Sequence, residues 1–308
     1  MKYALLFPGQ GSQSVGMLAA HTAPEVRDTF REASDVLGWD LATLVREGPA
    51  EELNRTEKTQ PALLAASIAI WRLWQSQGVA APAAFAGHSL GEYSALVAAS
   101  SLAFADALKL VELRGQLMQA AVPAGTGGMT AVVGMEDAAV TAMCAACPDG
   151  VLEPANLNAP GQVVVAGEIA ALAWLDANGK AHGARMVKRL AMSVPSHCSL
   201  MRGAAVQLAA ALAKIEVKPP PIRVLHNVDA AERRSADDIR DALAAQLHSP
   251  VRWTQTVQAL QADGITNLFE CGPGKVLVGL NKRIAEGLTS VGLEDPAGLA
   301  QAAQLVRG

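Results

Sequence analysis

Residues 79–99 read VAAPAAFAGHSLGEYSALVAA, and the centre of this stretch has the pattern Gly-x-Ser-x-Gly. An apolar run leads into the pattern and a helix-forming run leads out of it, which predicts a buried strand that turns sharply into a helix. Gly87 and Gly91 permit this tight turn because neither carries a Cβ. On such a turn the hydroxyl of Ser89 projects from the edge of a sheet, so the pattern predicts a nucleophilic serine.

The same turn indicates where a negative charge on a substrate would be stabilised. The helix that follows points its free amide groups back toward the serine, beginning with that of Leu90. A Gly-Gln-Gly segment at residues 9–11 ends a second apolar stretch near the N-terminus. If this segment faces Ser89, the amides of Gln10 and Leu90 form an oxyanion hole. The alternative is an ordinary turn at the end of a strand.

Composition narrows the class of protein. The chain has 308 residues, of which 51% are hydrophobic, 18% charged and only 4% aromatic, which suits helices packed on a sheet better than a β-sandwich. A net charge of −4 argues against a nucleic-acid-binding protein. No apolar run approaches the ~18 residues of a membrane span, and the N-terminal run is too short for a signal peptide. We therefore expect a soluble cytoplasmic protein with neither nucleic acid nor membrane as partner.

The order of predicted elements indicates an α/β fold with an insertion. Strands that alternate with helices predict a mostly parallel, covered sheet. After residue 126 the order becomes β-α-β-β-α-β, the ferredoxin-like arrangement. We expect a catalytic domain formed by residues 1–126 and 193–308, interrupted by a ferredoxin-like subdomain at residues 127–192. The elements expected in the subdomain are strands Met129–Val133, Val151–Asn156, Gln162–Gly167 and Arg185–Leu190 and helices Glu136–Cys147 and Glu168–Asn178.

A nucleophilic serine needs a base, and three histidines are candidates. His88 is adjacent to Ser89, but neighbouring side chains at a strand end point to opposite sides, so a structural role is favoured. His197 lies where the chain leaves the insertion, which places it beside the cleft between two domains. His226 is the second candidate. Spacing alone does not decide between a basic and a surface role for His197.

Arg114 lies on the apolar face of a predicted helix. The residues three and four positions away from it are all apolar: Leu110, Val111, Leu117 and Met118. A buried guanidinium stays charged and therefore requires an anion. A substrate carboxylate held through two parallel N–H···O bonds is one interpretation. An internal salt bridge, or a side chain that reaches solvent, is the other.

Cys144 and Cys147 form a Cys-x-x-Cys pattern, which can signal a redox or zinc site. No second pair and no nearby histidine completes a zinc set. We therefore interpret the two cysteines as small apolar residues on one helix and expect no metal.

Taken together, the motifs resemble the malonyl-CoA:acyl carrier protein transacylases of fatty acid synthesis, nearly from end to end. The segments that carry the resemblance are Pro8-Gly9-Gln10-Gly11-Ser12-Gln13, Gln60-Pro61-Ala62-Leu63, Gly87-His88-Ser89-Leu90-Gly91-Glu92-Tyr93, Arg114-Gly115, Val194-Pro195-Ser196-His197 and Gly272-Pro273-Gly274.

The resemblance implies an α/β-hydrolase-like domain with a ferredoxin-like insertion, and a Ser-His dyad without a carboxylate. The implied roles are Ser89 as nucleophile, His197 as base, the backbone carbonyl of Gln246 as the group that orients the imidazole, the amides of Gln10 and Leu90 as the oxyanion hole, Arg114 as the ligand of the malonyl carboxylate, and Gln60 as a residue lining the pocket.

The implied reaction is a ping-pong transfer of malonyl from malonyl-CoA to the phosphopantetheine thiol of acyl carrier protein, and it needs no cofactor. Three alternatives stay open: a hydrolase or thioesterase with the same turn, a non-catalytic subunit that docks carrier protein, and a related transferase of malonate decarboxylation or polyketide assembly. The sequence also leaves malonyl and methylmalonyl open as acyl groups, because one methyl group in an apolar pocket discriminates by only ~1–3 kcal/mol. Two basic pairs, Lys188-Arg189 and Lys282-Arg283, are candidates for carrier docking, the alternative being an ordinary solvated face.

Overall fold

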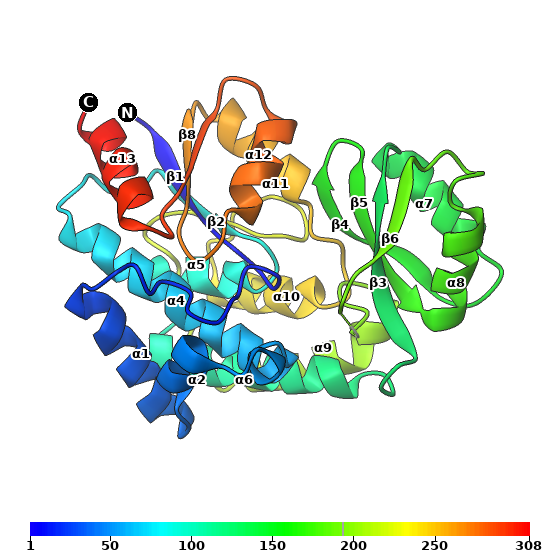
Figure 1. Cartoon of the computed structure of the whole chain (residues 1–308), viewed down its shortest axis with the longest axis horizontal. Coiled ribbons are helices and arrows are strands. Elements are labelled where there is room, and N and C mark those ends of the chain that lie inside the picture. Colours follow the sequence, from blue (N-terminus) through cyan, green and yellow to red (C-terminus); the bar gives the residue numbers. More distant parts are fainter. Residues whose placement is uncertain (193) are drawn as a thin grey trace.

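The structure is a computed structural model that describes residues 1–192 and 194–308. Residue 193, where the second segment of the catalytic domain is predicted to begin, lies outside the described residues. Figure 1 shows two sheets: one surrounded by helices on the left, and a smaller one, coloured green, on the right. We refer to these as sheet A and sheet B. No helix in the described part of the chain is long and apolar enough to cross a membrane.

Sheet A consists of five parallel strands in the order β7-β2-β1-β8-β9. Every residue of its three central strands is buried, as expected for a parallel sheet covered on both faces. Phe7 pairs with Gly87, so β1 and β2 end side by side. The segments that follow these strands are residues 9–11 and the Gly-x-Ser-x-Gly turn. Both therefore leave sheet A at the C-terminal ends of adjacent strands. The strands are β1 (Tyr3–Phe7), β2 (Ala84–Gly87), β7 (Val224–Leu225), β8 (Asn267–Glu270) and β9 (Thr289–Gly292).

Two apolar cores lie on opposite faces of sheet A. Because side chains alternate along a strand, Phe7 belongs to the larger core and Leu6 to the smaller one. The larger core lies against α4 and α6, and the smaller one lies against α11 and α12. The helices of this part are α1 (Pro24–Leu37), α2 (Leu41–Glu47), α3 (Ala50–Leu53), α4 (Thr56–Ser76), α5 (Gly91–Ala98), α6 (Phe104–Ala120), α9 (Arg202–Leu212), α10 (Ala236–Gln246), α11 (Trp253–Ala262), α12 (Val276–Ile284) and α13 (Pro296–Arg307), with a short 3₁₀ turn, η1 (Ser199–Met201).

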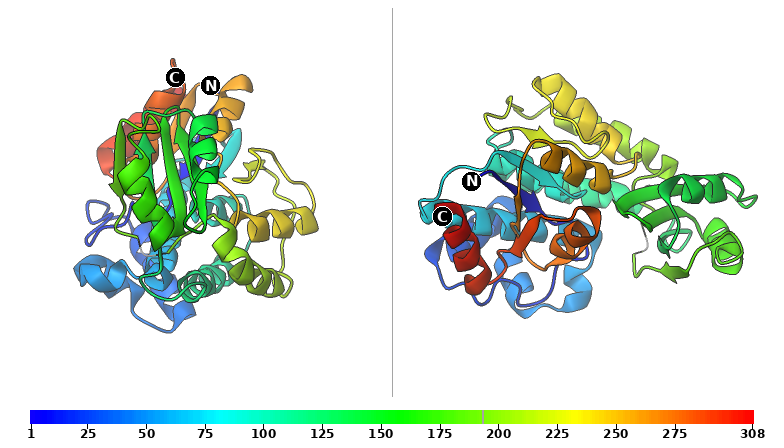
Figure 2. Two further views of the ribbon diagram at one scale, coloured as in Figure 1. Left: turned by 90° about the vertical axis from the view of Figure 1, so that its right-hand side faces the viewer. Right: turned by 90° about the horizontal axis from the view of Figure 1, so that it is seen from above.

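Sheet B is antiparallel throughout, with strand order β4-β5-β3-β6. Its elements follow one another as β3 (Gly127–Val133), α7 (Asp137–Ala145), β4 (Leu152–Ala159), β5 (Gln162–Glu168), α8 (Ile169–Asn178) and β6 (Met186–Arg189). Both helices pack on one face of the sheet, seen nearest the viewer in the left panel of Figure 2. The α/β class, the mostly parallel sheet A and the β-α-β-β-α-β order of sheet B confirm the predicted fold.

Most boundaries in this part of the chain differ from the prediction by one or two residues, and the largest difference is at the end of β4. Strand β4 continues to Ala159 instead of ending at Asn156, so the turn to β5 contains only residues 160 and 161. The extension continues the hairpin, because Leu157 and Ala159 pair with Val163 and Gln162 of β5, and β4 is also bonded to a segment outside sheet B. The Leu157 amide donates to the Val251 carbonyl at 2.9 Å, and the Val251 amide donates to the Ala155 carbonyl at 2.9 Å. These bonds also tie the outer strand of sheet B to the segment that begins α11.

Candidate active site

The turn between β2 and α5 holds Ser89 in a left-handed conformation, with φ of 52°. A Cβ on Gly87 would overlap the carbonyl of Gly91, and a Cβ on Gly91 would overlap the carbonyl of Phe7. Only glycine therefore fits on either side of the serine. A serine with positive φ is strained, and the strain directs its side chain away from the sheet and into the pocket.

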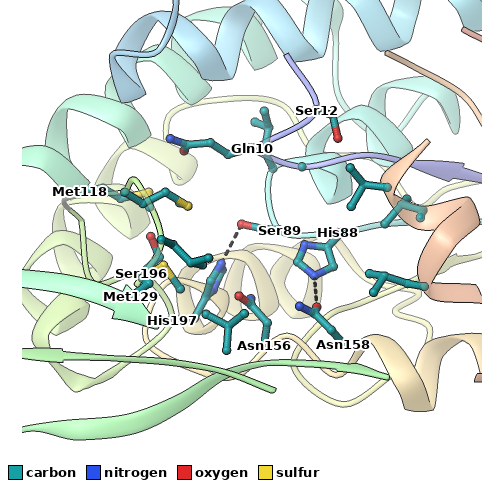
Figure 3. A pocket seen from close by; sticks show the side chains of 18 of the residues that line it. Gln10, Ser12, His88, Ser89, Met118, Met129, Asn156, Asn158, Ser196 and His197 are labelled. Carbon is teal, nitrogen blue, oxygen red and sulfur yellow. Dashed lines mark hydrogen bonds between the residues drawn. The ribbon is translucent and has the colours of Figure 1, made fainter. Parts of the chain in front are cut away.

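The hydroxyl of Ser89 meets the imidazole of His197. Ser89 Oγ lies 2.7 Å from His197 Nε2, as the upper dashed line in Figure 3 shows, and His197 Nδ1 lies 2.8 Å from the backbone carbonyl of Gln246. A carbonyl can only accept, so Nδ1 carries the proton and Nε2 is free to accept from the serine. Burial, reinforced by the charge of Arg114, lowers the pKa of His197 to about 3. The imidazole is therefore neutral at neutral pH, as a base must be.

Arg114 reaches the same hydroxyl from α6. Its Nη2 lies 3.3 Å from Ser89 Oγ and 2.9 Å from Gln246 Oε1, and its Nη1 donates to Gln60 Oε1 at 2.8 Å. The side chain is 1% exposed and makes no ion pair with any described residue. Among the described residues, Arg114 therefore shows neither of the two alternatives considered for it, an internal salt bridge or a side chain that reaches solvent. Burial lowers the pKa of Arg114, because desolvation disfavours the charged guanidinium.

The amides of Gln10 and Leu90 flank the same space. Both residues line the pocket, and within the described residues neither amide has a protein acceptor. The amide of Ser89 is not available in the same way, because it donates to Asn227 Oδ1 at 2.7 Å. Two residues whose amides have no protein acceptor among the described residues thus border the pocket that contains Ser89.

The other two candidate histidines have different partners. His226 Nδ1 lies 2.7 Å from a carboxylate oxygen of Glu92, buried behind the turn. His88 Nε2 lies 2.8 Å from Asn158 Oδ1, as the lower dashed line in Figure 3 shows, and burial lowers the pKa of His88. The structure therefore brings His197, and neither alternative, to the serine.

Several residues around the serine went unrecognised in the sequence. The side chain of Gln246 binds Arg114 through Oε1 and donates through Nε2 to the Ser89 carbonyl at 2.9 Å. Asn227 and Glu92 hold the turn from behind, and Asn158 comes from sheet B. Of these residues, only Glu92, which directly follows the Gly-x-Ser-x-Gly pattern, belongs to a sequence motif. The others come together only through the tertiary fold.

The pocket lies between the two sheets. The end of sheet A supplies the serine, while sheet B and the chain leaving it supply an apolar wall, part of which is seen at the left of Figure 3. The residues of this apolar wall are Met129, Val164, Leu190 and Met192, together with Met118 from α6. The pocket thus has a polar, charged end at Arg114 and an apolar flank.

The Cys-x-x-Cys pair lies away from this pocket. Cys144 is buried on α7, where burial raises its pKa to about 12, and Cys147 follows the helix. Both thiols are free. This placement fits two apolar residues of a helix, and the described residues contain no cluster suited to a metal ion.

Known proteins share this fold and sequence. A sequence profile of the acyl transferase domain family matches residues 4–286. The chain is 53% identical over 307 residues to the malonyl CoA-acyl carrier protein transacylase of Escherichia coli K12, covering 99% of each chain. It is 40% identical over 310 residues to the protein of that name from Bacillus subtilis, covering 99% of this chain and 98% of the relative.

Solved structures of transacylases have the same fold as this chain. The malonyl CoA-acyl carrier protein transacylase of Coxiella burnetii superposes with a TM-score of 0.98 at 44% identity, covering 100% of this chain and 98% of that one. A malonyl-transacylase solved in complex with a type II PKS acyl-carrier protein gives a TM-score of 0.97 at 51% identity, covering 99% of this chain and 100% of that one.

Proposed function

The chain belongs to the acyl transferase domain family, and from that premise we propose that it transfers malonyl from malonyl-CoA to acyl carrier protein for fatty acid synthesis. The observation that carries this proposal is the meeting of three groups. A serine hydroxyl lies 2.7 Å from a neutral imidazole and 3.3 Å from a buried guanidinium that forms no ion pair with a carboxylate of the described residues. A hydroxyl so placed suits acyl transfer, and the guanidinium suits an acyl group that ends in a carboxylate.

In the first half-reaction, Ser89 Oγ attacks the thioester carbonyl of malonyl-CoA while His197 Nε2 takes the hydroxyl proton. The amides of Gln10 and Leu90 stabilise the oxyanion of the tetrahedral intermediate. The carbon–sulfur bond then breaks, and the imidazolium returns the proton to the sulfur of CoA. The product is malonyl-Ser89, and CoA leaves.

The second half-reaction runs the same steps in reverse with a different thiol. The phosphopantetheine thiol of the carrier protein gives its proton to His197 and attacks the ester carbonyl of malonyl-Ser89. The serine oxygen leaves with the proton from the imidazolium. Neither half-reaction requires a metal or an organic cofactor, since malonyl-CoA enters as a substrate.

Arg114 gives the reaction its preference for malonyl. The malonyl carboxylate would take the place that neutral oxygens of Gln60 and Gln246 now share. An acetyl group brings no carboxylate and would leave the desolvated guanidinium without an anion. Gln60, predicted to line the pocket, is fully buried behind Arg114 and is not among the lining residues, so it would hold the guanidinium and not contact the substrate.

Docking of an acidic carrier is expected near the exposed lysines of the two basic pairs, Lys188 and Lys282. The adjacent arginines are already engaged: Arg189 with Asp176 at 2.9 Å and Arg283 with Gln162 at 2.7 Å. The lysines are therefore the freer charges. The cytoplasmic location, and the domain boundaries at residues 126/127 and 192/193, stay predictions from the sequence.

Mass spectrometry of the intact protein after exposure to malonyl-, methylmalonyl- and acetyl-CoA tests the proposal. We expect one malonyl adduct, removed when holo-carrier protein is added, with the malonyl group recovered on the carrier. Release of free malonate at the rate of CoA formation would instead indicate a hydrolase. An unmodified protein that binds carrier would indicate a docking subunit.

A further inference from the structure

A single buried side chain, that of Asn227, spans the turn that carries the nucleophile. The Ser89 amide donates to Asn227 Oδ1 at 2.7 Å, and Asn227 Nδ2 donates to the Gly87 carbonyl at 2.6 Å. One amide group thus bonds to the backbone before and after His88. Asn227 is 1% exposed, so water does not compete for these bonds.

These two hydrogen bonds matter because Ser89, whose amide makes one of them, has a strained backbone conformation. Ser89 has φ of 52°, a conformation that a residue with a side chain keeps only where its surroundings enforce it. Rotation of the backbone toward an ordinary conformation would swing Oγ away from His197 Nε2. Asn227 opposes that rotation by fixing the Ser89 amide and the Gly87 carbonyl at once.

Asn227 is fixed in turn by Glu92, on the first turn of α5. The fully buried carboxylate accepts from the backbone N–H of Asn227 at 3.0 Å, from His226 Nδ1 at 2.7 Å and from Gln246 Nε2 at 2.8 Å. The backbone carbonyl of the same Gln246 holds the imidazole of the dyad. A single buried cluster therefore connects the supports of Ser89 and of its base.

We infer that Asn227 is a positioning residue for the nucleophile: it acts through Ser89, not on the substrate. It sets the direction of Ser89 Oγ, and it occupies the Ser89 amide so that the oxyanion faces only the amides of Gln10 and Leu90. The inference rests on the proposed function because its readout is formation of malonyl-serine.

Replacement Asn227→Ala tests the inference by rapid-quench measurement of acylation with malonyl-CoA. We expect the acylation rate constant to fall about 100-fold, the effect of a displacement of ~1 Å, while the dissociation constant of malonyl-CoA changes less than about threefold. The matched control is Asn281→Ala. Asn281 is an equally buried asparagine whose side chain bonds to Trp253 and Ser290, and its loss should lower stability without slowing acylation.

Replacement Asn227→Asp supplies a readout that a folding defect would not give. A protonated aspartic acid has one acceptor and one donor, like the amide it replaces, whereas the carboxylate has no donor for the Gly87 carbonyl. The ionisable groups around it are Glu92 and His226 in the same cluster, with Arg114 and His197 beyond Gln246. We expect its acylation rate, relative to wild type at the same pH, to rise as the pH is lowered from 8 to 5.

The outcomes separate the inference from the proposed function. Wild-type protein that forms no malonyl-serine overturns the function. Wild-type protein that forms it, together with an Asn227→Ala variant that acylates at the wild-type rate, overturns the inference alone. The inference is also overturned if the acylation rate of Asn227→Asp, relative to wild type at the same pH, does not change with pH. This second variant tests the inference even if the alanine variant does not fold.

Discussion

Sheets A and B border the same pocket but contribute to it in different ways. The central strands of sheet A are buried on both faces, and the serine follows the end of one of them. Sheet B is covered by α7 and α8 on one face only; its other face contributes Met129 and Val164 to the pocket wall. The nucleophilic serine thus follows a strand buried on both faces, while the sheet that its own helices cover on one face shapes the space around the serine. Substitutions on the first side should change rate constants, and substitutions on the second should change substrate affinity.

The largest effect should come from Ser89→Ala. Without the hydroxyl no ester can form, so malonyl transfer should fall by about 10⁴-fold or more. Intact-mass analysis should show no malonyl adduct. The matched control is Ser94→Ala, which removes a buried hydroxyl on the following helix and should keep the adduct. A retained adduct in Ser89→Ala would move the nucleophile to another residue.

The next largest effect should come from Arg114→Ala, which removes the charged end of the pocket. Malonyl transfer should fall about 100-fold further than acetyl transfer, because charge-assisted hydrogen bonds contribute roughly 1.5–3 kcal/mol. The two transfer rates, measured with the two CoA thioesters, give the ratio. Arg114→Lys should recover only part of the preference, since an ammonium cannot form the paired bonds of a guanidinium. Equal losses for malonyl and acetyl would remove the carboxylate role.

A smaller effect should appear in the pH dependence of stability. The pKa of His197 is lowered to about 3 in the folded protein and is ordinary, near 6.5, when unfolded. Between these values the unfolded chain binds the extra proton, so this residue makes the fold less stable as the pH falls. Urea unfolding should show His197→Gln gaining up to about 2 kcal/mol on wild type between pH 7 and 5. A constant difference would contradict the lowered pKa.

The smallest effect should come from the side of sheet B. Asn158→Ala removes the partner of His88 Nε2 from the pocket, a neutral hydrogen bond that contributes about 1 kcal/mol. We expect KM for malonyl-CoA to rise about fivefold while kcat changes less than about twofold. Asn178→Ala, on α8 and away from the pocket, is the control. A larger loss in kcat than in affinity would break the division of roles between the sheets.

Local signals in the sequence were enough to predict the turn at Ser89, because two glycines, a preceding apolar run and a following helix are all contiguous. They also predicted the order of elements in sheet B. Strand β9 and helices α2, α3, α9 and α13 were not predicted, although Asp295 and Pro296 form a local helix-start signal for α13. Strand β7 is only Val224–Leu225, and Asn227 beyond it bonds with Glu92 and the turn at Ser89 and not with a neighbouring strand.

The partners of Ser89 were harder to predict, since they depend on distant segments. Position after the insertion pointed to His197, but only the fold brings it to the serine across 108 residues. Gln246 came from resemblance alone, because a backbone carbonyl leaves no mark in the residue type. The apolar face of α6 predicted that Arg114 is buried, but it did not predict which groups the guanidinium contacts. Asn227 carried no signal at all.

The acceptor behind His197 is part of the main chain, and this has a consequence for mutational scanning. In many serine enzymes the equivalent acceptor is a carboxylate that one codon change can delete. Here every residue type offers the same oxygen at position 246, so a saturation library would report only what the glutamine side chain does. The contact that selects the tautomer is genetically silent, and only an amide-to-ester replacement in the backbone would expose it.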